Sequence, residues 1–303
     1  MDQLKAIICD FKYQNGIGKM DQLFNLFKPI LLTEIETVMD NKISYSTKPR
    51  TKVENFVNAL YGMLDEGGKY KNIKTKYGLS SGCYCGYLKI CYEYKIFEKL
   101  HASILTEFSS FITIDTTTDT FTVRAKGAQD AKGYHHKEKS KVGTSVSIVS
   151  DLNRIPLSTY VDAGNIDDRK MLSKTLEDPR IRINGKRNMF ADKGYTGREF
   201  KNTINQTHQI NLICPPKRVG GPSKKNTTEP ATIRMTHILT EEEAIGLKKH
   251  RNKIEHVNQI FRNFRSVDIR YTKNISAYLC YISFACVLTT IMKLKDAVTY
   301  SSS

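Results

Sequence analysis

Three acidic residues stand at positions where a carboxylate could do chemistry. Asp115 follows the apolar run "FITI", and Asp192 follows "NMFA". Glu255 lies inside "KKHRNKIEHVNQIFRNFR", a stretch with helical periodicity. A carboxylate at the end of an apolar strand must be exposed, paired with a cation or bound to a metal ion. The first question is which of these states the three residues share.

The helix that carries Glu255 has an apolar stripe, which predicts that one face packs on the core. This stripe consists of Ile254, Val257, Phe261 and Phe264. Glu255 lies one position round from the stripe, together with Arg251 and Arg262, and Lys248 and Asn258 fall near the same face. Glu255 could therefore pair with Arg251 at the surface, or it could border a site at the edge of the core.

Two aspartates on strands and a glutamate on a later helix suit metal-assisted phosphoryl transfer. Mg²⁺ binds carboxylate and water oxygens and leaves positions open for phosphate. Two such ions about 4 Å apart can activate the attacking oxygen and stabilise the leaving one. Because three convergent carboxylates repel one another without cations, a site of this kind predicts bound metal.

The first aspartate has a rival. Asp119 shares the strand parity of Asp115. We choose Asp115, because four β-forming residues precede it and Asp119 lies nearer the expected turn into the next strand.

The charge of the chain predicts an anionic partner. The 303 residues carry 47 Lys+Arg and 31 Asp+Glu, a net charge of +16. Residues 111–240 hold 22 basic and 13 acidic side chains, a net +9. Nucleic acid is the simplest partner for such a surface. The seven cysteines are an odd number in a large chain, which favours a reducing compartment over a disulfide scaffold.

The periodicity divides the chain into two regions. Residues 1–108 show helical patterns and form a helical N-terminal region, in which "YGLSSG" could be the turn of a DNA-binding helix-turn-helix. From residue 109 to 303, short runs rich in Val, Ile, Thr and Phe alternate with helical patterns. This order predicts an α/β domain whose mixed sheet is flanked by helices.

Three further segments are expected within the second region. Asp167 or Asp168 caps a helix. The polar stretch 217–240 forms a loop before the Glu255 helix, which begins with Thr240 as N-cap and Glu243 three residues later and runs to about Phe264. The apolar segment 275–294 is long enough to span a membrane, but its polar residues favour a buried terminal helix and no membrane partner.

With these motifs in place, the chain resembles the DDE transposases of bacterial insertion sequences, specifically the group numbered five within the wider group numbered four. The resemblance covers roughly residues 50–295. It rests on "TIDTTTDTFTVRAKG", "PLSTYVDAGNIDD", "FADKGYTG" and "KKHRNKIEHVNQIFRNFRSVDIRYTKN". It implies a ribonuclease-H-like catalytic domain with Asp115, Asp192 and Glu255 as the catalytic, metal-binding triad, holding Mg²⁺ or Mn²⁺, as two ions.

The Glu motif departs from the family pattern of Tyr, two residues, Arg, three residues, Glu, six residues, Lys. Arg251 and Glu255 match, whereas Lys248 replaces the Tyr and Arg262 replaces the Lys. Arg262 still offers a cation, although Arg and Lys are not interchangeable. With Lys193, these three basic residues are the expected contacts to DNA phosphates.

The resemblance also implies partners and activity. The expected partners are double-stranded DNA with terminal inverted repeats, a target DNA and a second copy of the chain. The alternative is a captured transposase that acts as a DNA-binding protein or a metal-dependent nuclease. The expected location is the cytoplasm of a bacterium, or the nucleus or viral factory if the host is a eukaryote or a virus. The roles of His135, His136 and Tyr195 stay open: the histidines lie in a basic loop, and Tyr195 could stack on a base or, as we expect, pack under the next helix.

Overall fold

The computed structural model describes residues 2–9, 18–40, 50–68, 70–134, 142–178, 180, 186–216, 218–219, 234–235 and 239–301. Helices make up its N-terminal third. They are α1 (Asp2–Cys9), α2 (Lys19–Asp40), α3 (Arg50–Asp65), the 3₁₀ turn η1 (Tyr70–Asn72), α4 (Ile73–Tyr77), α5 (Ser81–Glu93), α6 (Ile96–Glu107) and η2 (Ser109–Phe111). Gly78, with φ 67°, ends α4, and the Ser80 side chain caps α5 by accepting from the Cys83 backbone nitrogen. The "YGLSSG" segment is therefore a turn between two helices.

A seven-stranded mixed sheet follows. Its strands are β1 (Thr116–Ala125), β2 (Gly133–Tyr134), β3 (Val142–Asp151), β4 (Pro156–Ala163), β5 (Arg187–Phe190), β6 (Ile210–Ile213) and β9 (Ile269–Arg270). β1 pairs antiparallel with β3, and β3 pairs antiparallel with β4. On its other side β1 pairs parallel with β5, which pairs parallel with β6. Antiparallel and parallel pairs together make the mixed sheet that the sequence predicts, and this sheet is consistent with a ribonuclease-H-like fold.

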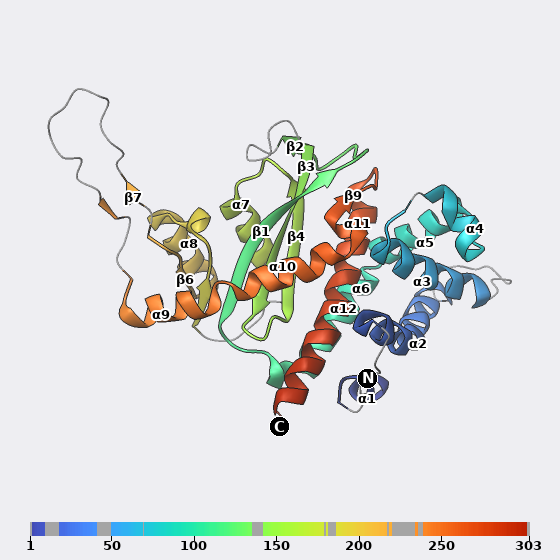
Figure 1. Ribbon diagram of the computed structural model, residues 1–303, viewed down its shortest axis with the longest axis horizontal. Coiled ribbons are helices and arrows are strands. Elements are labelled where there is room, and N and C mark those ends of the chain that lie inside the picture. Colours follow the sequence, from blue (N-terminus) through green and yellow to red (C-terminus); the bar gives the residue numbers. More distant parts are fainter. Residues whose placement is uncertain are drawn as a thin grey trace.

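Helices cover both faces of this sheet. They are α7 (Asp168–Leu176), η4 (Lys193–Tyr195), α8 (Arg198–His208), α9 (Glu241–His250), α10 (Lys253–Asn263), α11 (Arg265–Asp268) and α12 (Ile275–Ser301). Thr120 of β1 and Ser147 of β3 face α7, since Thr175 of α7 donates to the Ser147 hydroxyl. Alternate residues of β1 face α10, which crosses the sheet diagonally (Figure 1). The predicted α/β fold with a helix-flanked mixed sheet is confirmed.

The capping signals in the sequence hold. Asp167 is the N-cap of α7, and Thr240 and Glu243 form a capping box at the start of α9. The expected single helix from Thr240 to Phe264 is wrong in one respect, because α9 and α10 are separated at Arg251 and Asn252. Two short paired strands, β7 (Arg218–Val219) and β8 (Arg234–Met235), lie within the expected loop.

The apolar terminal helix α12 is buried, as its polar residues indicate. By length and composition Ile275–Thr299 could span a membrane, yet most of its side chains are covered by the rest of the protein. α12 lies between the sheet and the N-terminal helices and contacts α1, α2, α5, α6 and β4 (Figure 1). It therefore joins the two regions into one core.

A buried histidine in this core predicts a pH-dependent stability. His101 Nε2 lies 3.0 Å from the Pro156 carbonyl and 2.9 Å from Thr290 Oγ1, and Arg180 donates to its Nδ1 at 3.0 Å. Burial, followed by the charge of Arg180, lowers the pKa of His101 from 6.5 to about 3. Below pH 6.5 the imidazole of His101 takes up a proton in the unfolded chain but stays neutral in the folded chain until about pH 3. The free energy of unfolding therefore decreases as the pH falls through this range.

We expect the free energy of unfolding to fall by about 1.4 kcal/mol more per pH unit in the wild type than in His101→Gln between about pH 6 and pH 4. The glutamine amide can still donate to Pro156 and accept from Arg180. Denaturant unfolding at several pH values measures both slopes. Equal slopes would show that His101 is protonated alike in the folded and unfolded states.

Candidate active site

The parallel pairing of β1 with β5 determines which aspartates meet. Thr116 is opposite Met189, and Thr117 is opposite Phe190. Continued by two residues, this register places Asp119 at the level of Asp192, and continued backwards it places Asp115 at the level of Asn188. Because side chains alternate along a strand, Asp119 and Asp192 point to the same face of the sheet, the face covered by α10.

Asp119 is a half-buried carboxylate with one fixed contact. Asn258 Nδ2 of α10 donates to Asp119 Oδ2 at 2.8 Å. Burial is the main cause that raises the pKa of Asp119 from 3.8 to about 6, and the negative charges of Asp168 and Asp192 raise it further. The carboxylates at this edge therefore repel one another, which is the electrostatic state that a cation would relieve.

The structure places Asp119, and not the predicted Asp115, at the level of Asp192. Asp115 precedes β1, and Asp115 Oδ1 accepts a hydrogen bond of 2.9 Å from the Asn188 backbone nitrogen. At a strand rise of about 3.3 Å per residue, four residues separate it from Asp119 by about 13 Å. The run "FITI" is no strand, since Ile114 is 57% exposed, and no turn separates Asp119 from the rest of β1.

Asp192 lies at the tip of β5, as the sequence predicts, and is the N-cap residue of η4. Its side chain is 46% exposed, and Arg251 Nη2 lies 3.5 Å from Asp192 Oδ1. Such an exposed ion pair at the outer distance limit contributes little to stability. It shows instead that the α9–α10 junction reaches over the end of β5.

Glu255 lies between the two side chains that contact the aspartates. Arg251, four residues before it, pairs with Asp192, and Asn258, three residues after it, binds Asp119. Arg251 and Asn252 keep right-handed helical backbone angles across the junction. Residues spaced by three and four share a helix face, so this face directs Glu255 toward the carboxylate pair. Glu255 is exposed.

The three acids are not assembled into a finished metal site. Within the described residues, no group of three or more His, Cys, Asp or Glu side chains is close enough to hold an ion. The donor set nevertheless fits a hard divalent cation, because it offers carboxylate oxygens at a half-buried edge. One further donor is Asn258 Oδ1, which is buried and has no hydrogen-bond partner among the described residues.

The predicted DNA-binding cations have different surroundings. Lys193 and Lys248 are exposed. Arg262 instead packs on β1: its guanidinium lies 5.2 Å from the centre of the Phe121 ring, and Nη2 donates to the Thr122 carbonyl. His135 and His136 lie outside the described residues.

Two residues near the pair complete the surroundings of the site. Tyr195 is 1% exposed, as a packing role requires, and its hydroxyl lies 2.9 Å from Thr120 Oγ1 of β1. Asp168 is a neighbour that the sequence did not indicate. A Cβ at Gly194 would lie 3.3 Å from Asp168 Oδ2, and the charge of Asp168 acts on both Asp119 and Tyr195. Its only signal is the Asp167–Asp168 pair at the start of α7.

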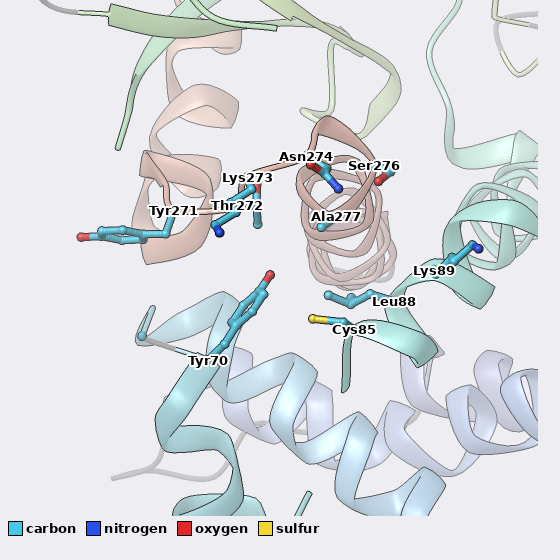
Figure 2. A pocket seen from close by; sticks show the side chains of 11 residues that line it. Tyr70, Cys85, Leu88, Lys89, Tyr271, Thr272, Lys273, Asn274, Ser276 and Ala277 are labelled. Atoms are coloured by element: carbon cyan, nitrogen blue, oxygen red, sulfur yellow. The ribbon is translucent and has the colours of Figure 1, made fainter. Parts of the chain in front are cut away.

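A separate cavity of about 700 Å³ lies between the N-terminal helices and the start of α12 (Figure 2). Tyr70, Cys85 and Leu88 line one side, and the Tyr271–Ala277 segment lines the other. None of the predicted site residues lies in it. It is distinct from the carboxylate edge.

Comparison with solved structures gives the class of the fold. The chain superimposes with a TM-score of 0.52 on a chain of the cryo-EM structure of the piggyBac transposase synaptic complex with hairpin DNA. The match covers 95% of this chain and 77% of that chain, at 10% sequence identity. At this identity the likeness concerns the fold alone.

The sequence itself matches the family described as "Transposase DDE domain" over residues 108–288. The chain belongs to this family, and it is a metal-dependent DNA-cleaving enzyme. No curated protein matches the chain.

Proposed function

We propose that the chain cleaves and joins DNA strands at the ends of a mobile element, using Asp119, Asp192 and Glu255 as its catalytic carboxylates. The observation that carries the proposal is the meeting of Asp119 and Asp192 beneath the α9–α10 segment, whose Arg251 and Asn258 contact them on either side of Glu255. Membership of the transposase family supports the reaction class. Asp115, the first choice from the sequence, is not part of this proposal.

The three carboxylates would hold Mg²⁺, for which Mn²⁺ substitutes, as two ions. Bound ions of this kind supply an activated attacking oxygen and stabilise the leaving oxygen. The protein's own contribution is positioning. The hydrogen bond from Asn258 holds the side chain of Asp119 in place. Tyr195 packs against Thr120 and so supports β1, the strand that carries Asp119.

Arg251 has two tasks in this proposal. In the free protein it partly neutralises Asp192. When a phosphodiester enters, the guanidinium can turn to a phosphate oxygen, and Asp192 is then free to hold an ion. Lys193 and Lys248 stand exposed near the same edge, where they would position the DNA backbone without reading its sequence. Arg262 contacts the Phe121 ring and the Thr122 carbonyl, so we propose that it stabilises β1 in addition to any contact with a phosphate.

The finer features rest on the sequence motifs. We propose that the element is an insertion sequence of the group numbered five, that its ends are inverted repeats, and that the chain acts as a homodimer on paired ends. These proposals describe the DNA substrate and the assembly of the protein. The reaction itself is assigned to Asp119, Asp192 and Glu255.

The test uses purified protein, DNA that contains the element's ends, and Mg²⁺ or Mn²⁺. We expect the wild type to nick the end and to join the new 3′-hydroxyl to a target duplex, and Asp192→Ala to do neither. Equal nicking by the two proteins would contradict the proposed site.

A second candidate is favoured by one observation. Lys248 occupies the position where the family motif has Tyr, so the chain lacks a hydroxyl there. A captured transposase that acts as a nuclease or DNA-binding protein would keep cleavage or binding without strand joining. Cleavage that depends on Asp192 but never yields joined product would support that candidate.

A further inference from the structure

Three cations meet beside the carboxylate edge: Arg154, Lys249 and Lys253. Lys253, the first residue of α10, donates from Nζ to the Leu152 carbonyl at 2.8 Å, two residues before Arg154. Lys249 lies four residues before Lys253, across the α9–α10 junction. We call these three residues the basic cluster.

The cluster is close enough for its charges to act on one another. Arg154 and Lys249 both lie close enough to Lys253 for their charges to act on its ammonium group. Lys253 and Lys249 also act on His250, whose pKa is lowered by burial first and then by these two charges, while the negative charge of Asp115 opposes this. Two elements far apart in the chain therefore bring like charges to one place.

No described carboxylate neutralises the cluster. Within the described ranges, no ion pair involves Arg154, Lys249 or Lys253. The charge of Asp151 acts on Lys253, but the Asp151 oxygens accept hydrogen bonds from the backbone nitrogens of Thr113, Asn153 and Ile155. Burial raises its own pKa to about 6. Grouped cations without a counter-ion cost free energy that a bound anion would recover.

Two features in or beside the basic cluster are typical of ligand-binding sites. Arg154 has φ 68° in the turn between β3 and β4, a left-handed conformation that costs an ordinary residue roughly 1–2 kcal/mol. His250 Nδ1 is buried and has no hydrogen-bond partner among the described residues. Strained backbone and unpaired polar atoms of this kind gather at sites that bind something.

We propose that Arg154, Lys249 and Lys253 bind backbone phosphates of the DNA strand, on the Asp115 side of the carboxylate pair. This inference rests on the proposed function and extends it, because it states where one flank of the DNA lies. The cluster contributes affinity and position, and no base recognition.

The experiment measures DNA affinity without cleavage. Fluorescence anisotropy with a short labelled duplex of arbitrary sequence, in EDTA, follows the binding constant against salt. We expect Lys249→Met with Lys253→Met to lower the salt slope by about 2 and the affinity at physiological salt by about tenfold.

The chain offers a matched control. Lys170→Met with Lys174→Met also removes two lysines four residues apart, but both lie on α7, which covers the opposite face. We expect its salt slope to stay close to that of the wild type. Equal losses in the two double variants would overturn the basic cluster and leave the proposed function standing.

A second variant guards against a change in folding at the start of α10. Arg154→Asn leaves α10 untouched and tolerates a positive φ, so it should lower the slope by about 1. A wild-type slope in Arg154→Asn would remove Arg154 from the cluster and contradict the proposal. If the wild type itself binds no duplex at low salt, the proposed function fails together with it.

Discussion

Asp119→Asn should abolish strand cleavage, whereas Asp115→Asn should leave it within about tenfold of the wild type. Asp119 lies beside Asp192 and beneath Asn258, and Asp115 accepts from the Asn188 backbone about four strand positions away. Loss of a metal-binding carboxylate removes several kcal/mol of transition-state stabilisation, and about 4 kcal/mol is a factor of roughly 10³ in rate. Cleavage of end-containing DNA in Mg²⁺ under single-turnover conditions measures the difference.

The same pair of variants has opposite expectations for stability. Asparagine at 119 removes a buried charge that its neighbours repel, so Asp119→Asn should be as stable as the wild type or more stable. Asparagine at 115 weakens the hydrogen bond to Asn188 and should cost about 1 kcal/mol. An inactive but well-folded Asp119→Asn is thus separated from a merely unfolded protein. The reverse pattern of activity would restore Asp115 to the site.

Glu255→Gln should reduce cleavage by about 10³-fold or more and leave the affinity for duplex DNA nearly unchanged. Glu255 is exposed on α10, between Arg251 at the α9–α10 junction and Asn258, so its substitution disturbs no packed core. The carboxylate is required only where it completes the donor set with Asp119 and Asp192. Single-turnover cleavage and anisotropy binding with the same DNA separate the two effects.

Two controls sharpen this prediction. Glu242→Gln changes an exposed glutamate in the first turn of α9 and should cleave like the wild type. Asp168→Asn tests the acid whose charge also raises the pKa of Asp119. Full activity of Glu255→Gln together with an inactive Asp168→Asn would assign the third carboxylate to α7 and not to α10.

The sequence predicted those parts of the fold that depend on local patterns. The capping box at Thr240, the cap at Asp167 and the buried terminal helix each follow from a few neighbouring residues, and each is present. The order of the strands also predicted a mixed sheet. The single helix expected over 240–264 is interrupted at Arg251, where the side chain contacts Asp192 beyond the end of β5, and the helical period of the sequence does not show this break.

The choice between Asp115 and Asp119 needed the sheet. "FITI" has β-forming residues but is partly exposed, whereas the polar run Thr116–Thr118 is fully buried in β1. Those threonines satisfy their hydroxyls within the sheet, as Thr117 does by donating to the Phe190 carbonyl at 3.0 Å. A hydrophobicity pattern therefore places the strand too early. The register with β5, a contact over more than 70 residues, decides which aspartate meets Asp192.

The sequence also could not predict which residues surround each acidic side chain. Asp168 enters through the packing of α7 against η4, and the basic cluster joins the β3–β4 turn to the start of α10. Asn258 could be placed near the Glu255 face by helical spacing, but its bond to Asp119 depends on the crossing of α10 over β1. Local spacing thus identified two of the three proposed carboxylates, and long-range packing identified the third.

Binding of Mn²⁺, measured by electron paramagnetic resonance on the protein–DNA complex, tests the proposed carboxylate site most directly. The proposed site predicts that the wild type and Asp115→Asn bind the ion alike, and that Asp119→Asn, Asp192→Asn and Glu255→Gln each weaken binding by tenfold or more. Retained Mn²⁺ binding in Asp119→Asn, together with its loss in Asp115→Asn, would contradict the assignment.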